Sequence, residues 1–162
     1  MSSDLQFPWQ QEAVIHQSQR ILHSFQHWTG HSLLDASGSP IEIARALFEA
    51  PFPVFSHGTE PDPIYNYANC KGLELWEMDW QQLTQTPSRY SAEPMEQEER
   101  LRLLDQVNTQ GYVSNAQGIR ISSKGNRLQV SDFIVWNLID EQNQLCGQAA
   151  TFSQWKPLPE SG

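Results

Sequence analysis

The most regular hydrophobic pattern in the chain lies near its C-terminus, in residues 127–139. Apolar residues at alternating positions would share one side of a strand: Leu128, Val130, Ile134, Trp136 and Leu138. From Phe133 onward the opposite side is apolar too, through Phe133, Val135 and Ile139. The pattern therefore predicts a β-strand that is covered on both of its faces.

Polar segments on both sides of this strand predict an antiparallel meander. Residues 140–144 are short and polar, as in a hairpin loop, and residues 145–155 can return beside the central strand. The polar run 122–126 would form the preceding turn and pair the central strand with residues 118–121. Three consecutive strands are therefore expected at the C-terminal end.

Helical spacing of apolar residues dominates the chain upstream of the meander. Residues 9–28 are predicted to form an amphipathic helix that ends near Gly30. Another helix should begin at the capping box Ser39-Pro40-Ile41-Glu42. A longer helix is expected at 93–109, with its inward side formed by Met95, Leu101, Leu104 and Val107. Between these helices the sequence predicts two strands and a short helix, at 54–59, 64–68 and 69–76.

The charge of the chain excludes some classes of partner. Its 162 residues include only 10 Lys and Arg and give a net charge of -9, so the basic surface that binds nucleic acid or an anionic membrane is lacking. No apolar run reaches the length of a membrane span, and the first residues lack the pattern of a secretion signal. We therefore expect a cytoplasmic protein of one domain that binds neither nucleic acid nor membrane.

Four short segments resemble the MEKHLA domain. They are Pro-Phe-Pro-Val-Phe-Ser-His at 51–57, Tyr-Ala-Asn at 67–69, Pro-Ser-Arg-Tyr-Ser-Ala-Glu-Pro at 87–94 and Val-Trp-Asn-Leu-Ile-Asp at 135–140. The resemblance covers residues 20–155. This PAS-like domain occurs in stand-alone bacterial proteins, particularly of cyanobacteria, and at the C-terminus of plant class III homeodomain-leucine zipper factors.

The resemblance implies an α+β fold of the PAS type. In that fold a five-stranded antiparallel sheet carries helices on one face, where a pocket forms, and we expect the N-terminal helix to pack on the other face. The expected organisation is an N-terminal helix and linker at 1–34, a PAS-like domain at 35–156 and a flexible tail at 157–162. The implied function is non-enzymatic, either sensing of a small molecule or regulated association with a partner.

Residues that could bind a ligand in the expected pocket are mostly aromatic or hydrogen-bonding. The candidates are Tyr67, Trp76, Arg89, Ser91, Trp136 and Asn137. Arg89 attracts attention because an arginine among hydroxyl residues can bind a carboxylate or phosphate with two parallel hydrogen bonds. The structural alternative for Arg89 is a salt bridge to Glu93 or Asp79. His57 could respond to pH, or be only a hydrogen-bonded surface group.

The usual PAS cofactors fit this sequence poorly, and the ligand is left unidentified. Asn69-Cys70-Lys71 is similar to the flavin-reactive Asn-Cys-Arg of photosensor PAS domains, but their cysteine lies one helix later, where residues 87–91 have none. Haem sensors often carry a histidine on the long helix, and residues 93–109 have none. His23 and His27 have the spacing of metal ligands, yet no carboxylate or cysteine nearby completes a site.

Two other classes of function remain open. One is a cavity enzyme of the nuclear-transport-factor-like kind, for which Asp132 is the candidate carboxylate, although an aspartate within a strand is typical of a bulge. The other is a pure homodimerisation module with a filled core. A homodimer is expected in either non-enzymatic case, with an interface formed by Ile15, Leu22, Phe25, Phe133 and Val135.

Overall fold

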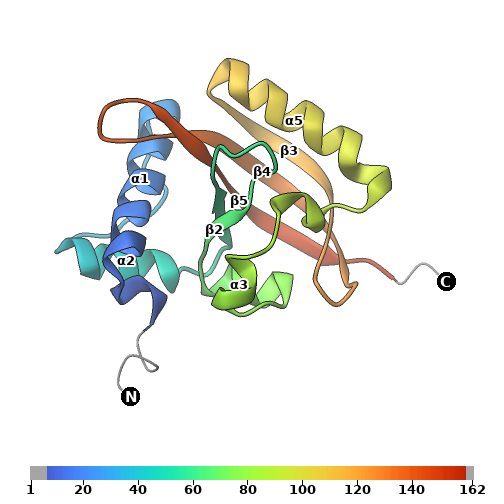
Figure 1. The fold of residues 1–162 in the computed structure, drawn as a ribbon, viewed down its shortest axis with the longest axis horizontal. Coiled ribbons are helices and arrows are strands. Elements are labelled where there is room, and N and C mark those ends of the chain that lie inside the picture. The colour runs from blue at the N-terminus through green and yellow to red at the C-terminus, as the bar shows by residue number, and fades with distance from the viewer. Residues whose placement is uncertain (1–6, 160–162) are drawn as a thin grey trace.

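One antiparallel sheet runs through the centre of the protein, with its strands in the order β2-β1-β5-β4-β3 (Figure 1). The computed structural model describes residues 7–159. The first six residues of the predicted N-terminal segment and the last three of the predicted tail lie outside the described residues. The strands are β1 (Val54–His57), β2 (Tyr65–Ala68), β3 (Tyr112–Ile121), β4 (Arg127–Ile139) and β5 (Leu145–Pro157). Because every neighbouring pair is antiparallel, the predicted five-stranded sheet is confirmed.

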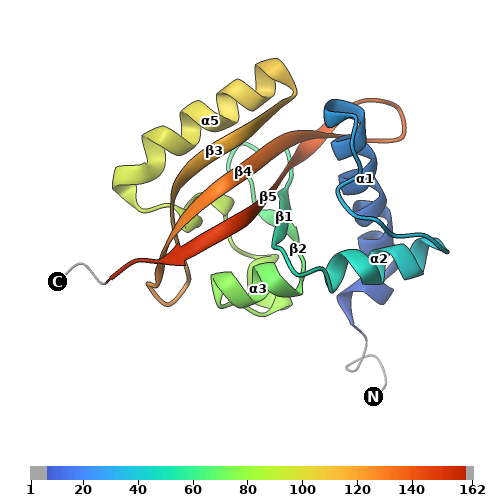
Figure 2. The same ribbon diagram turned by 180° about the vertical axis from the view of Figure 1, so that it is seen from behind.

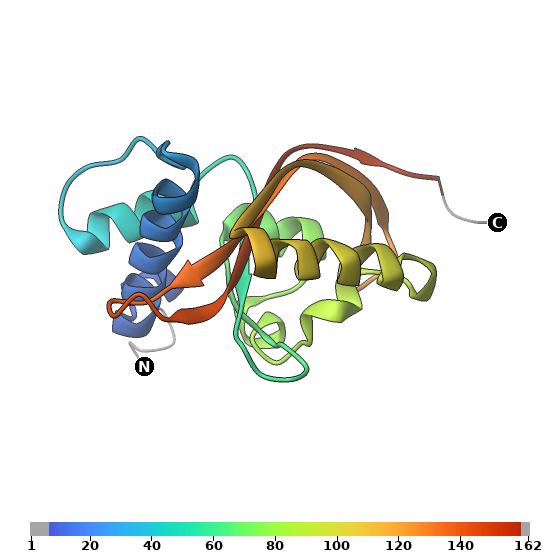
Figure 3. The ribbon, with the colours of Figure 1, turned by 90° about the horizontal axis from the view of Figure 1, so that it is seen from above.

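Helices lie on both faces of the sheet (Figure 2; Figure 3). The face that we call outer is covered by two helices, α1 (Glu12–Thr29) and α2 (Pro40–Phe48). The concave inner face carries α3 (Cys70–Trp76) and α5 (Gln97–Gln110), with α4 (Trp80–Leu83) beside β2. Short 3-10 turns complete the connections at η2 (Pro8–Gln10), η3 (Ser88–Ser91) and η4 (Pro94–Glu96). The N-terminal helix lies, as predicted, on the face opposite α3 and α5, and α2 shares that face with it.

Local sequence signals set the ends of these helices. Ser39 and Glu42 form the predicted capping box, in which each side chain accepts a hydrogen bond from the backbone of the other. Asn69 caps α3 by accepting from the backbone N–H of Gly72 over 3.0 Å. Gly30 ends α1 in the left-handed conformation, with φ 75°.

A separate hydrophobic core forms on each face. The inner core is built from residues that include Phe55, Trp76, Leu103, Val107, Val130, Phe133, Val135 and Phe152. The outer core, under α1 and α2, includes Ile21, Phe25, Leu47, Tyr67, Trp136 and Leu138. Each of these large side chains contributes about 1.5–3 kcal/mol to folding when it is fully buried. The central strand β4 supplies both cores, so the prediction that it is covered on both faces is confirmed.

The predicted faces of β4 are wrong for part of the strand, because the chain bends at Asp132. This residue has a left-handed backbone with φ 55°, and a left-handed residue in a strand exchanges the faces of the side chains that follow. Val130 and Phe133 consequently both enter the inner core, although they are an odd number of residues apart. The neighbouring strand bends with β4, so Val130 still pairs with Trp155 and Phe133 with Phe152.

The long helix also differs from its prediction. It begins at Gln97 after the separate turn η4, and Met95 and Leu101 are exposed instead of facing inward. The buried side of α5 carries Arg100, Leu103 and Val107. Strand β3, predicted only for 118–121, already begins at Tyr112. Among the described residues, no helix has the length and apolar character needed to cross a membrane.

Candidate functional site

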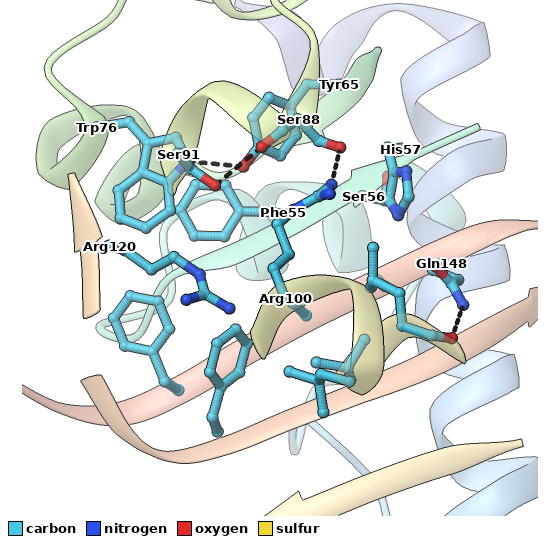
Figure 4. A pocket seen from close by; sticks show the side chains of 17 residues that line it. Phe55, Ser56, His57, Tyr65, Trp76, Ser88, Ser91, Arg100, Arg120 and Gln148 are labelled. Atoms are coloured by element: carbon cyan, nitrogen blue, oxygen red, sulfur yellow. Dashed lines mark hydrogen bonds between the residues drawn. The ribbon is translucent and has the colours of Figure 1, made fainter. Parts of the chain in front are cut away.

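The inner face of the sheet encloses a cavity of about 60 Å³ (Figure 4). Strands β1, β2, β3, β4 and β5 form its floor and walls, and α3, η3 and α5 cover it. Most of the lining is aromatic or aliphatic, including Phe55, Trp76, Leu103, Phe133, Val135 and Phe152. The polar side chains around it are Tyr65, Ser88, Ser91, Arg100, Arg120, His57 and Gln148. An apolar enclosure with a few polar groups is the usual composition of a small-molecule site.

Arg100 is the most unusual of these polar residues. It lies on the buried side of α5, one turn before Leu103 and Leu104, and only 8% of it is exposed. One of its terminal nitrogens donates to the Ser88 hydroxyl over 2.6 Å, and no carboxylate of the described residues forms an ion pair with it. Burial lowers the pKa of Arg100, but a guanidinium stays charged in proteins. The cavity wall therefore contains a buried positive charge without a counter-ion.

The second cavity arginine, Arg120, is neutralised by a partner. Its guanidinium is 4% exposed by side chain and pairs with the Glu99 carboxylate over 2.9 Å. The same nitrogen donates to the backbone carbonyl of Ile119, and the guanidinium lies 5.3 Å from the ring centroid of Phe133. Arg120 thus has a structural explanation that Arg100 lacks.

His57 brings a second incompletely bonded group to the cavity. In β1 the side chains alternate, so Phe55 and His57 point inward while Val54 joins the outer core. The Nδ1 atom of His57 is buried and has no hydrogen-bond partner among the described residues. Burial first, and then the positive Arg100, lower the pKa of His57 to about 4 from 6.5, and Gln148 partly opposes this. The imidazole is therefore neutral at pH 7.

Gln148 and Asn137 connect the cavity to the rest of the sheet. The Gln148 amide, which lines the cavity, donates to Asn137 Oδ1 over 3.2 Å. Asn137 in turn donates through Nδ2 to the carbonyl of Val107 on α5, over 3.1 Å. These bonds fix the orientation of both amides.

A surface cleft of about 220 Å³ adjoins the cavity at His57 and Gln148, which line both spaces. The rest of the cleft is lined by the loop after β1, the start of β5 and one residue of α5: Gly58, Thr59, Glu60, Pro63, Leu145, Gly147 and Asn108. The His57 and Gln148 side chains therefore stand between the cavity and solvent.

Of the predicted ligand-binding residues, the structure brings Trp76 and Ser91 to the cavity and places the others elsewhere. Trp76 donates to the Tyr65 hydroxyl over 2.9 Å, and Ser91 donates to the carbonyl of Ser88. Tyr67 and Trp136 belong to the outer core, because strand alternation and the bend at Asp132 turn them away from the cavity. Asn137 lies behind Gln148 and does not line the cavity itself.

Arg89 is also outside the cavity. Its guanidinium is about half exposed and pairs with Asp62 over 3.0 Å, a partner that differs from the predicted Glu93 or Asp79. Glu93 instead pairs with Arg127 over 2.8 Å. The arginines that line the inner cavity are Arg100 on α5 and Arg120 on β3, and not Arg89 in the loop. The missed signal was a charged residue, Arg100, at helical spacing from Leu103, Leu104 and Val107.

The residues predicted for a dimer interface lie mostly inside the chain. Leu22 and Phe25 pack in the outer core, where the Phe25 ring meets the edge of Trp136 at 5.0 Å between centroids. Phe133 and Val135 line the inner cavity, so their expected outer position is corrected. Ile15 is half-buried on α1. Self-association stays a prediction.

The histidine pair His23 and His27 and the two cysteines lie outside the inner cavity. The rings of His23 and His27 are 6.5 Å apart, and within residues 7–159 no group of three metal-binding side chains is found. Cys70 is exposed at the start of α3, and Cys146 packs against the outer core. Burial raises the pKa of the Cys146 thiol.

Solved structures with the same fold are PAS and LOV domains. A PAS domain from Colwellia psychrerythraea is 16% identical, with a TM-score of 0.58 over 68% of this chain and 92% of that chain. A light-oxygen-voltage domain studied with a flavin analogue is 13% identical, with a TM-score of 0.57 over 73% of this chain and 85% of that one. The dark structure of the Aureochrome1 LOV photoreceptor is 17% identical, with a TM-score of 0.52 over 76% and 88%.

The residues of this chain do not fit a flavin. A cavity of about 60 Å³ is far smaller than the roughly 300–1,000 Å³ of sites for larger ligands. Neither Cys70 nor Cys146 lines the cavity, so neither is placed to react with a ring bound there. The likeness to the LOV domains is therefore one of fold.

The family assignment rests on the sequence. No protein with a curated description matches the chain. The family model of the MEKHLA domain matches residues 15–157, which begin within α1 and end with β5. The chain belongs to the MEKHLA domain family.

Proposed function

We propose that this protein is a non-enzymatic sensory or regulatory module that binds a small molecule in its inner cavity. The observation that carries the proposal is the pair of buried, incompletely bonded side chains, Arg100 and His57, on the wall of one apolar cavity. Buried polar groups are nearly always hydrogen-bonded, so such groups call for a partner that the folded chain does not supply.

The arrangement of the remaining polar groups supports binding over catalysis. No aspartate or glutamate of the described residues lines the cavity. Asp132, the candidate base for the enzyme alternative, is exposed and accepts a hydrogen bond from Ser153. The cavity hydroxyls of Ser88 and Ser91 are already bonded to Arg100 and to a backbone carbonyl. Neither serine hydroxyl is bonded to His57, the imidazole on the same wall, so the described residues of the cavity contain no nucleophile that is hydrogen-bonded to a general base.

A hydrogen-bonded chain provides a route from the cavity to α1. Gln148 borders the cavity and binds Asn137, whose backbone carbonyl accepts a hydrogen bond from the Trp28 indole over 2.9 Å. A ligand that re-orients Gln148 changes the hydrogen bond to Asn137 on β4, the strand to which Trp28 of α1 is bonded. Ligand binding would then favour one position of α1 over another, which is how a population shift transmits a signal.

The experiment is a thermal-shift screen of the full chain against a library of small metabolites. A compound that binds only the folded state raises Tm, by an amount that grows with its concentration. The Ala150→Leu variant fills the cavity from β5, and the exposed Ala13→Leu is its control. We expect a set of small compounds to raise Tm in the wild type and in Ala13→Leu but not in Ala150→Leu. If no compound does so, or if all three proteins respond equally, the proposal is wrong.

Native mass spectrometry of the same preparation adds two readings. It reports any small molecule retained from the cell, and it counts the subunits. If the wild-type protein retains a small molecule and Ala150→Leu does not, the cavity is supported as the binding site. The subunit count tests the expected homodimer independently of ligand binding.

A further inference from the structure

We propose that the inner cavity is selective for a small monocarboxylate of about two to four carbon atoms, whose carboxylate binds the Arg100 guanidinium. This inference rests on the proposed function of the cavity as a ligand site and names the chemical class of the ligand. Three properties of the cavity carry it: its charge, the shape of its charged group and its size.

The charge on the cavity wall is positive and is not balanced. Arg100 is 8% exposed and has only the Ser88 hydroxyl, 2.6 Å away, as a hydrogen-bond partner among the described side chains. Arg120, on the same wall, is paired with Glu99 over 2.9 Å and therefore adds little net charge. An isolated charge in an apolar interior is costly, and an anion beside it removes most of that cost.

The shape of the charged group favours a carboxylate. A guanidinium presents its N–H groups in a planar fork, and a carboxylate accepts two of them in parallel. Phosphate and sulfate carry oxygens on every side. Around Arg100 the Ser88 and Ser91 hydroxyls are already bonded and Arg120 is paired with Glu99. The apolar part of the wall, formed by Phe55, Phe133 and Phe152, offers no donors to those additional oxygens. The same rings suit a short alkyl chain, because its burial against them removes apolar surface from water.

The second polar group limits the ligand to one negative charge. His57 faces the same cavity and is neutral, so it can exchange a hydrogen bond with a hydroxyl or keto group but does not balance a second carboxylate (Figure 4). The groups around this imidazole are Arg100 on α5, Gln148 on β5 and Glu60 in the loop after β1. The cavity volume of about 60 Å³ restricts the ligand to a few heavy atoms.

An NMR titration of the 162-residue chain, with ¹⁵N-labelled arginine side chains, tests the inference. The probes are sodium acetate, propionate, pyruvate and lactate, compared at equal ionic strength with sodium chloride, phosphate and succinate and with neutral acetamide. We expect saturable shifts of the Arg100 Nε signal with the monocarboxylates alone. Equal binding of acetamide, chloride, phosphate or succinate would overturn the assignment.

Two variants on the same helix locate the binding. Arg100→Lys keeps the positive charge but loses the planar fork, so we expect the monocarboxylate to bind about tenfold more weakly or worse. Arg102→Lys changes an exposed arginine that pairs with Glu98, and it should leave the affinity unchanged. If Arg100→Lys does not fold, the selectivity among the probes for the wild-type protein still decides.

The outcomes separate this inference from the proposed function. If monocarboxylates fail to bind but other compounds stabilise the wild type and not Ala150→Leu, the carboxylate class is wrong and the cavity remains a ligand site. If neither experiment detects binding, both are wrong, and ordered water is the partner of Arg100 and His57.

Discussion

The indole nitrogen of Trp28, at the end of α1, donates a hydrogen bond to the backbone carbonyl of Asn137 near the C-terminal end of β4, over 2.9 Å. The ring also lies against Gly111, where an added Cβ would come within 2.4 Å of it. This bond attaches α1 to β4 at Asn137, the residue that accepts a hydrogen bond from Gln148, and it adds to the bonds that Ile21 and Ser24 of α1 make with β4. The attachment combines packing with one directional bond, and each part can be removed separately.

Trp28→Phe should destabilise the protein by about 1–2 kcal/mol, because it removes this hydrogen bond and part of the buried ring. Urea denaturation followed by circular dichroism measures the loss. Trp155→Phe is the control, since the Trp155 ring packs on Phe152 but no hydrogen bond of its indole is found in the described chain. Equal losses in the two variants would mean that the Trp28 bond contributes nothing.

His57 predicts a specific loss of stability in mild acid. Its pKa is lowered to about 4 in the folded protein, from 6.5. The unfolded chain therefore takes up a proton below pH 6.5 while the folded protein does not, and stability falls as the pH falls until the folded pKa is reached. Between pH 6.5 and pH 5 the expected loss from this residue is about 1.5 kcal/mol.

Denaturation curves at several pH values test the titration of His57. In His57→Gln the group that titrates is gone, so the free energy of unfolding should change by about 1.5 kcal/mol less over the same interval. If the variant follows the wild-type pH dependence, His57 is not the neutral buried group that we describe.

Asn69 is a structural residue, although its segment is similar to a cofactor motif. The side chain is fully buried and makes four hydrogen bonds: it accepts from the backbone of Val54 and Gly72 and donates to the carbonyls of Leu47 and Phe52. Asn69→Asp replaces two donors by a carboxylate that faces two carbonyls. We expect a loss of about 3–5 kcal/mol.

The exposed cap of α4 provides the matched control for Asn69→Asp. Asp79 accepts from the backbone N–H of Gln82 over 2.7 Å, and Asn caps a helix about as well as Asp. Asp79→Asn should therefore change the free energy of unfolding by less than about 0.5 kcal/mol. Chemical denaturation of both variants makes the comparison, and a small loss in Asn69→Asp would contradict the network.

Features that neighbouring residues determine could be predicted from the sequence, and features that depend on contacts between distant segments could not. The caps at Ser39 and Asn69 are local, and both were read correctly from neighbouring residues. The faces of β4 were not, because the bend at Asp132 also depends on the matching bend of β5. Arg100 became a candidate only when folding placed it on the wall of the same cavity as His57, since helical periodicity alone treats a lone arginine as an irregularity of the buried side.

Gly147 should tolerate no side chain, since β5 passes very close to β1 at this position. Its φ is +151°, and an added Cβ would lie 2.1 Å from the backbone carbonyl oxygen of His57. Gly147→Ala must push the two strands apart beside the cavity, and we expect it to lower the free energy of unfolding by about 2–4 kcal/mol.

Gly125→Ala is the control that separates the close contact from the backbone conformation. Gly125 also has a positive φ, +85°, but an added Cβ there would meet no atom within 4 Å. Gly125→Ala should cost only about 1–2 kcal/mol, measured by urea denaturation of both proteins. Similar losses would show that backbone conformation, and not the contact with His57, excludes a side chain at Gly147.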